Sequence, residues 1–159
     1  MTASDISLRV ATAADLDDIN RVIDAAILTW DLPERVKRLS LSSYHYNDLD
    51  LQHYTILVAV QADQIVGVVA WDTQVHQLAN QQQGLLLHGI YVHPDFQQQG
   101  IGTRMFNRAE QAVIAAKLDG LLVKAQKDAE AFYQSRGMHK LAVTDSQREF
   151  AARYWKPVS

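Results

Sequence analysis

The residues best suited to chemistry lie in one segment where a strand-like run meets a helix-like run. The segment reads His88-Gly-Ile-Tyr-Val-His-Pro-Asp-Phe-Gln-Gln-Gln-Gly-Ile-Gly-Thr-Arg104. Backbone N–H groups at the start of a helix lack partners and carry a partial positive charge, and glycine allows an anion to approach them closely. The turn with Gly100 and Gly102 therefore predicts a site for a phosphate or pyrophosphate group.

Two familiar phosphate-binding motifs do not fit this turn. No Lys-Ser or Lys-Thr follows Gly102, as a P-loop requires, and Gly100-Ile-Gly102 lacks the third glycine of a dinucleotide fingerprint. On glycine spacing alone, a tight strand-to-helix turn that binds no ligand explains the residues equally well.

Other kinds of active site are disfavoured by what the chain lacks. Cysteine is absent, which excludes disulfides, Cys-ligated metals and a thiol nucleophile. The six histidines show no metal-ligand spacing, and no Gly-x-Ser-x-Gly elbow occurs. We therefore expect no metal site and no serine hydrolase.

The composition predicts one globular domain over residues 1–159. The 159 residues are 48% hydrophobic and 21% charged, and no linker-like stretch divides them. A net charge of −3 is far from the basic balance that binds nucleic acid. With no apolar stretch at the N-terminus and none long enough for a membrane span, we expect a cytoplasmic protein without membrane contact.

Hydrophobic periodicity predicts alternating strands and helices, and hence an α/β (α+β) fold. A capping pair, Thr12 and Asp15, precedes a helical stripe that runs from Leu16 to Trp30. The short polar segment 61–63 between two apolar runs indicates an antiparallel hairpin. Strands are expected at 6–10, 55–60, 64–71, 84–92, 121–125, 138–143 and 149–155, helices at 34–41, 103–117 and 128–136, a polar loop at 42–50 and a turn at 144–147.

Two motifs in this order resemble the GCN5-related N-acetyltransferase (GNAT) family. Gln97-x-x-Gly100-x-Gly102, preceded by Ile90-Tyr-Val-x-Pro94, is similar to the family's motif A, and Ala129-x-x-Phe132-Tyr133-x-x-x-Gly137-Met138 is similar to its motif B. The element order matches the family over nearly the whole chain. The resemblance implies a GNAT-type mixed, mostly antiparallel central sheet of six to seven strands, flanked by about four helices.

The resemblance also implies that acetyl-CoA is the co-substrate. The backbone N–H groups from about Gln99 to Arg104 would hold the pyrophosphate, which includes those of Gly100, Ile101, Gly102 and Thr103, with Gln97 and Gln98 at the mouth of the turn. The main chain of Ile90, Tyr91 and Val92 would bind the pantetheine where this strand splays from 121–125. Gln126 stands where relatives frequently have Asn, and Gln98 and Gln99 stand where they often have a basic residue or glycine.

Acetyl transfer to an amine needs a neutral amine, an oxyanion donor and a proton for the departing thiolate. By the resemblance, Tyr133 would protonate the sulfur and a backbone N–H near Val92 would stabilise the oxyanion. Residue types alone also fit Tyr133 as a core aromatic. His88 could act as the base, because histidine titrates near neutral pH, with an ordered water chain as the alternative.

The amine acceptor would be a small molecule or a protein, held by the variable region 28–50 and the loop 144–147. The first region mixes aromatic and acidic residues that could hold a cationic amine, although Arg35, Lys37 and Arg38 oppose this. A catalytically silent coenzyme A-binding or regulatory domain, or a phosphate-binding module unrelated to coenzyme A, are alternative functions. Exposed edge strands are compatible with a homodimer.

Overall fold

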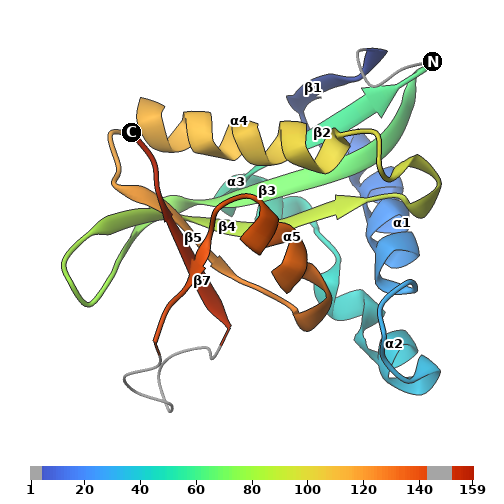
Figure 1. The fold of residues 1–159 in the computed structure, drawn as a ribbon. Coiled ribbons are helices and arrows are strands. Elements are labelled where there is room, and N and C mark those ends of the chain that lie inside the picture. The colour runs from blue at the N-terminus through green and yellow to red at the C-terminus, as the bar shows by residue number, and fades with distance from the viewer. Residues whose placement is uncertain (1–4, 143–151) are drawn as a thin grey trace.

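A seven-stranded sheet forms the centre of the molecule in the computed structural model, which describes residues 5–142 and 152–159 (Figure 1). The strand order is β1-β2-β3-β4-β5-β7-β6, and all neighbours are antiparallel except the parallel pair β4 and β5. The fold is therefore the predicted mixed, mostly antiparallel α/β type. The strands are β1 (Ser7–Val10), β2 (Tyr54–Gln61), β3 (Gln64–Gln77), β4 (Gln83–Val92), β5 (Gly120–Lys124), β6 (His139–Lys140) and β7 (Arg153–Pro157).

Helices cover both faces of this sheet. On one face α4 (Ile101–Ala115) and α5 (Glu130–Ser135) pack against alternate residues of β2 to β5, with Met105 and Phe106 fully buried. On the other face α1 (Leu16–Ile27) packs Ile19 and Ile23 against β2 and β3. The helices α2 (Glu34–Ser40) and α3 (Asp48–His53) follow α1 in the chain, and no helix among the described residues is long and apolar enough to cross a bilayer.

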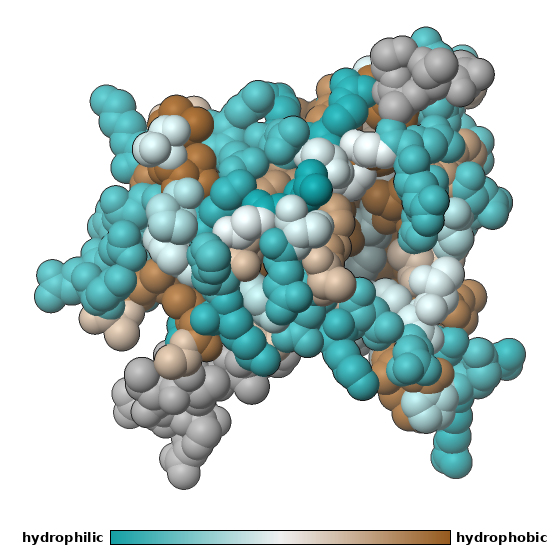
Figure 2. All heavy atoms as spheres, in the orientation of Figure 1, coloured by the Kyte–Doolittle hydropathy of each residue, from teal (hydrophilic) through white to brown (hydrophobic). Residues whose placement is uncertain are grey.

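The surface of the molecule is hollowed on the side that Figure 2 shows. Hydrophobic side chains lie at the bottom of this hollow, and hydrophilic side chains surround its rim. It lies between the α4–α5 side and the α1–α2 side of the molecule. The predicted phosphate-binding turn therefore belongs to a concave part of the surface.

The pairing between β4 and β5 is short, and this shapes the hollow. The two strands pair only from Gly84 with Gly120 to Leu87 with Val123. Beyond Leu87, β4 keeps β3 as its neighbour but loses β5. The sheet therefore opens into a fork at the carboxyl ends of these two parallel strands, as the resemblance implied.

Several predicted elements differ from the structure. Helix α1 ends at Ile27 rather than at Trp30, and 42–50 is not one polar loop, because it contains a 3₁₀ helix, η3 (Leu41–Tyr44), and the start of α3. Asn47 and Asp50 cap α3 reciprocally, with N–H to side-chain distances of 2.8 and 3.1 Å, so this helix start could have been recognised. The strand predicted at 138–143 is two residues long within the described part, β7 extends to Pro157, and the predicted turn 144–147 lies outside the described residues.

An ion pair fixes the step from β1 into α1. The Arg9 guanidinium donates to both oxygens of Asp15 at 2.8 and 3.0 Å, and the Thr12 N–H donates to the same carboxylate at 2.8 Å. These contacts, with Arg9 the largest cause, lower the pKa of Asp15 from 3.8 to about 2. The capping pair predicted from Thr12 and Asp15 is therefore present, and Arg9 adds to it.

We expect Asp15→Asn to lower the free energy of unfolding at pH 7 by about 1 to 2 kcal/mol, since Arg9 is half exposed and water screens part of the attraction. Because the folded-state pKa is depressed, this stabilisation is present above about pH 4 and is lost as the pH falls through about 2. Urea unfolding of wild type and variant across this range measures the difference. The matched control is Asp17→Asn, at an exposed position in the first turn of α1; an equal loss in both variants would contradict the prediction.

Candidate active site

The N-terminus of α4 presents a row of unused backbone donors. No hydrogen bond among the described residues uses the backbone N–H groups from Gln98 to Thr103. The chain reaches this helix through two left-handed positions, Gln98 at φ 64° and Gly100 at φ 79°. Such a turn brings successive N–H groups to one side of the backbone, and the helix dipole adds to their positive potential. The arrangement can hold an anion such as pyrophosphate.

Arg104 is a correction to the predicted donor set. Its backbone N–H donates to the Gly100 carbonyl at 3.0 Å, and its guanidinium donates to the Ile6 carbonyl at 2.7 Å. The N–H has an acceptor within the helix, as the fourth residue of a helix normally does, and the guanidinium reaches the chain before β1. The row of free donors therefore ends at Thr103.

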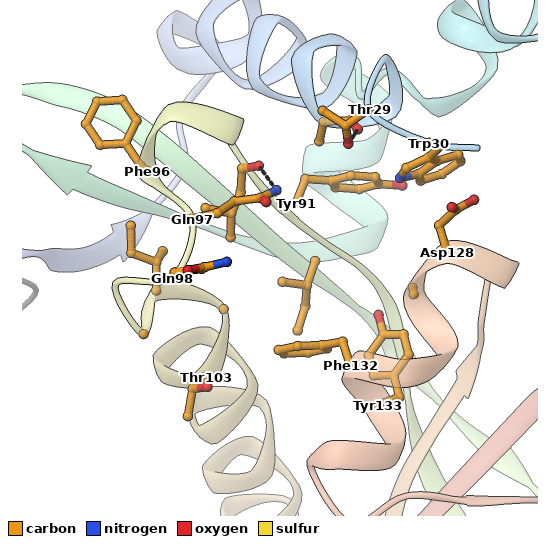
Figure 3. Close-up of a pocket in the computed structure, with 17 residues that line it drawn as sticks. Thr29, Trp30, Tyr91, Phe96, Gln97, Gln98, Thr103, Asp128, Phe132 and Tyr133 are labelled. Atoms are coloured by element: carbon orange, nitrogen blue, oxygen red, sulfur yellow. Dashed lines mark hydrogen bonds between the residues drawn. The ribbon is translucent and has the colours of Figure 1, made fainter. Parts of the chain in front are cut away.

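A cavity of about 520 Å³ adjoins this turn (Figure 3). Gln97 and Gln98 line it, whereas Gln99 does not and instead accepts a 3.4 Å hydrogen bond from the Gln61 side chain. A side chain at Gly102 would enter this cavity, since a Cβ there would lie 3.3 Å from the Phe132 ring, which also lines it. The remaining lining comes from the end of α1 and the loop after it, the end of β4, the segment that leads into α4, and α5 with the turn before it, namely Ala26, Thr29, Trp30, Ile90, Tyr91, Val92, Phe96, Gly100, Ile101, Thr103, Asp128, Ala129, Phe132 and Tyr133.

The free edge of β4 forms one side of the fork. The His93 N–H donates to the Val66 carbonyl at 2.9 Å, and backbone groups alternate sides along an antiparallel strand. The N–H and C=O groups of Ile90 and Val92 therefore point away from β3, toward the missing β5. The main chain of Tyr91 was expected at this free edge as well, but it faces β3. Tyr91 lines the cavity with its side chain instead.

A bulge at His88 shifts the alternation by which the side chains of β4 face α4 or the opposite side of the sheet. Leu87 pairs with Trp71 and Gly89 pairs with Ala70, so His88 is the extra residue. As a result Leu85 and Leu87 face α4 before the bulge, and Ile90 and Val92 face it afterwards. The bulge leaves His88 exposed at the start of the fork.

A second cavity, of about 310 Å³, opens beside the first and contains His88. Five residues line both cavities: Trp30, Ile90, Tyr91, Ala129 and Tyr133. The other lining residues of the second cavity are Ser43, Tyr44, Leu86, Leu87, Gly89, Lys124, Ala125 and Gln126. Gln126, predicted as a cofactor contact, therefore lies on the side of the second cavity.

His88 is held between two tyrosines. The Tyr46 hydroxyl lies 2.8 Å from Nδ1, and the Tyr54 ring lies with its centroid 4.4 Å from that of the imidazole. Part of the ring is open to solvent, and the burial of the rest against these tyrosines is the largest cause that lowers the pKa of His88 below 6.5. Asp50 and Asp72 oppose this shift, and Lys124 adds to it. At neutral pH the imidazole is therefore uncharged. Its Nε2 can accept a proton when Nδ1–H donates to the Tyr46 oxygen.

Tyr46 is itself fixed from α1 and is 3% exposed. The Asn20 side chain bonds both its N–H, at 2.8 Å, and its carbonyl, at 3.0 Å, and the neighbouring His45 lies 2.6 Å from Asp24. Burial raises the pKa of Tyr46 well above 10, which keeps its hydroxyl protonated. Sequence reasoning placed Tyr46 only in the acceptor region, because a contact between residues 46 and 88 has no local signal.

Tyr133 is a buried aromatic residue whose hydroxyl faces the site. Its ring packs near Phe132 and Phe106, with centroid distances of 5.4 and 6.5 Å, and the residue is 3% exposed. Its hydroxyl points into the space between α5 and β4 (Figure 3), and no other described residue hydrogen-bonds to it. Burial raises its pKa above 10, so it carries its proton at all physiological pH values.

A bridge over the junction of the cavities comes from the loop after α1. Trp30 packs edge-on against Tyr44 at 5.4 Å, and the Asp31 N–H donates to the Asp128 carboxylate at 3.1 Å. The buried Lys37 holds this loop by donating to the Leu28 carbonyl at the end of α1, at 2.9 Å. The two segments that the bridge joins are 97 residues apart in the chain.

The acidic residues expected to hold a cationic acceptor do not line either cavity. Glu34 pairs with Lys37 at 3.0 Å, Asp50 caps α3, and Asp31 reaches the site only through its N–H. Trp30 and Tyr44 from the same region do line the second cavity. Within the part of the chain that the structure describes, no three histidines or carboxylates lie together as potential metal ligands.

Comparisons with known proteins agree with this architecture. The structure of the PaiA N-acetyltransferase from Thermoplasma acidophilum in complex with coenzyme A superposes with a TM-score of 0.76 at 14% identity, over 96% of this chain and 98% of that one. A GNAT family acetyltransferase from Brucella melitensis in complex with acetyl-CoA gives 0.65 at 15% identity, over 97% and 88%. AtaT complexed with acetyl-methionyl-tRNAfMet gives 0.61 at 17% identity, over 96% and 95%.

At these identities the structural likeness shows the fold alone, and no curated protein matches the chain by sequence. The family model of the GNAT acetyltransferase domain, in contrast, matches residues 33–152. This match spans most of the chain and includes both motifs and the fork. The chain therefore belongs to the GNAT acetyltransferase family.

Proposed function

We propose that residues 1–159 form a single N-acetyltransferase domain that moves an acetyl group from acetyl-CoA directly to the primary amine of a small acceptor. The observation that carries this proposal is the pair of adjoining cavities, one beside the free N–H groups of α4 and one beside His88. Their shared wall contains Tyr133, so two substrates bound one in each cavity would meet at its hydroxyl.

The first cavity suits coenzyme A in two independent ways. The free N–H groups from Gln98 to Thr103 would bind the pyrophosphate, and the outward main chain of Ile90 and Val92 would bind the amide groups of the pantetheine. When bound, acetyl-CoA supplies the activated thioester. Its pantetheine would occupy the place of a strand beside β4.

The chain's own residues then supply the acid, the base and the oxyanion donor. The Val92 N–H faces the fork, where it can stabilise negative charge on the acetyl oxygen. Nε2 of His88 accepts a proton from the attacking amine, and the Tyr133 hydroxyl donates a proton to the leaving sulfur. One proton is taken up and one is given, so the products are the acetylated amine and the free thiol.

A catalytically silent coenzyme A-binding domain is the alternative. It would use the same turn and the same fork but would release no thiol with any amine. Binding of an RNA-linked molecule, such as the acetyl-methionyl-tRNAfMet with which AtaT is complexed, has less support, because this chain carries a net charge of −3.

Gly102→Val tests the cofactor site. We expect the variant to bind coenzyme A at least about tenfold more weakly in calorimetry, because its side chain would cover the N–H groups and meet Phe132. The control is Ala115→Val, an exposed position at the far end of the same helix that lines neither cavity. Wild type should bind coenzyme A but neither NAD nor ATP, and should release thiol with at least one amine. Binding without thiol release from a broad amine panel would favour the silent domain.

Tyr133→Phe should lower kcat about 10²- to 10⁴-fold at saturating acetyl-CoA, because it removes the acid and keeps the buried ring. Its affinity for coenzyme A should stay unchanged. Tyr154→Phe is the matched control, since that hydroxyl bonds Glu130 and Gln134 and lines neither cavity. Unaltered turnover in the Tyr133 variant would remove this residue from the mechanism.

The pH dependence of kcat should show an acidic limb with a midpoint below about 6.5, because burial lowers the pKa of His88 and only neutral imidazole accepts a proton. As the pH falls through that pKa, His88 becomes protonated and kcat decreases. His88→Ala should abolish this limb, whereas the exposed His53→Ala should leave it in place. If the limb persists unshifted without His88, water carries the proton.

A further inference from the structure

The second cavity has an unexpected charge for a site that receives an amine. Its lining contains no carboxylate, and Lys124 is its one permanently charged side chain among the described residues. Lys124 makes no ion pair or hydrogen bond with any other described side chain. A simple cationic amine would meet the Lys124 side chain inside this cavity, whereas Asp50 and Asp72, whose charges act on His88, do not belong to the lining.

The fork explains why Lys124 lies beside the reacting groups. Leu87 and Val123 are the last paired residues of β4 and β5, so His88 and Lys124 are the first residues after the strands separate. Paired residues of parallel strands share a face, and the residues that follow them share the opposite one. Both side chains line the second cavity.

The rest of this cavity is small and largely aromatic. Its volume of about 310 Å³ is near the lower end of the range for small-molecule sites, about 300 to 1,000 Å³. Trp30, Tyr44 and Tyr91 provide ring surface on which an apolar side chain can pack. A zwitterion with an apolar side chain matches this combination of one cation and several rings.

We propose that the acceptor is a free amino acid with an apolar or aromatic side chain, whose carboxylate pairs with Lys124. This inference rests on the proposed acetyl transfer and names the substrate class for the same site. Pairing the carboxylate leaves the α-amine free to reach His88 and Tyr133. A nearby ammonium group also disfavours the protonated amine, which must lose a proton before it attacks.

The test compares amino acids with their amides. L-phenylalanine, L-leucine and L-methionine are assayed against the corresponding primary amides by thiol release at saturating acetyl-CoA. We expect kcat/KM to be at least about tenfold higher for the acids, the usual range for a charged hydrogen bond. At a given pH a larger fraction of the amides than of the acids has a neutral amine. This difference favours acetylation of the amides, so it cannot produce the expected preference for the acids.

Variants of Lys124 make the test specific. Lys124→Gln should lower kcat/KM for the acids about 10- to 100-fold and change it much less for the amides, while Lys124→Arg should retain most of the acid preference. The control is Lys127→Gln, an exposed lysine close by in the chain that lines neither cavity. Calorimetry of L-phenylalanine with the wild type and Lys124→Gln, each saturated with desulfo-coenzyme A, measures the same contact without turnover.

The outcomes separate this inference from the function on which it rests. The role of Lys124 would be overturned, while acetyl transfer stands, by either of two results. One is that amides or carboxylate-free amines are acetylated as well as the acids, and the other is that Lys124→Gln keeps the preference for acids. Coenzyme A binding without thiol release from any amine would refute the proposed function, and the inference with it. Acid preference that is lost in Lys124→Gln but kept in Lys127→Gln would support both.

Discussion

The premature end of pairing between β4 and β5 is the constraint on which the site depends. Four residue pairs hold these parallel strands together, and the strands then diverge while β3 still supports β4. This leaves a rigid strand with one edge that no strand pairs, where the Val92 carbonyl accepts a 3.4 Å hydrogen bond from the Gln97 side chain. The backbone groups of this edge that lack a partner cost free energy unless a ligand or water satisfies them. Both cavities border on that edge, and the turn into α4 lies at its far end.

Packing on the two faces of the sheet keeps the fork open. On one face α4 approaches the sheet closely, since a Cβ at Gly67 would lie 3.1 Å from Met105 and 3.2 Å from Ile101. On the other face α1 fixes Tyr46 through Asn20, and Tyr46 in turn contacts His88. The site is therefore built on regular elements whose positions the core determines, which favours a preformed geometry over one that assembles on binding.

Much of this could be predicted from the sequence, because the signals are local. Gly100 and Gly102 between a strand pattern and a helix pattern indicate the anion-binding turn, and the apolar runs on either side of 61–63 indicate a hairpin, which the structure confirms with β2 and β3. Two relations of His88 could not be predicted, because they join residues far apart in the chain. His88 contacts Tyr46, 42 positions away, and lines the second cavity together with Lys124, 36 positions away. Gly89 was an unused signal, because glycine inside a strand often marks a bulge.

The wall that the two cavities share has a kinetic consequence. Ile90, Tyr91 and Tyr133 line both cavities, so a molecule bound in the first cavity would form part of the wall of the second. The bridge from Asp31 to Asp128 passes over their junction. For the acetyl transfer proposed above, this geometry favours an ordered addition in which acetyl-CoA would enter first and the acceptor second. The free thiol product would then leave last and compete with the next thioester molecule for the same turn.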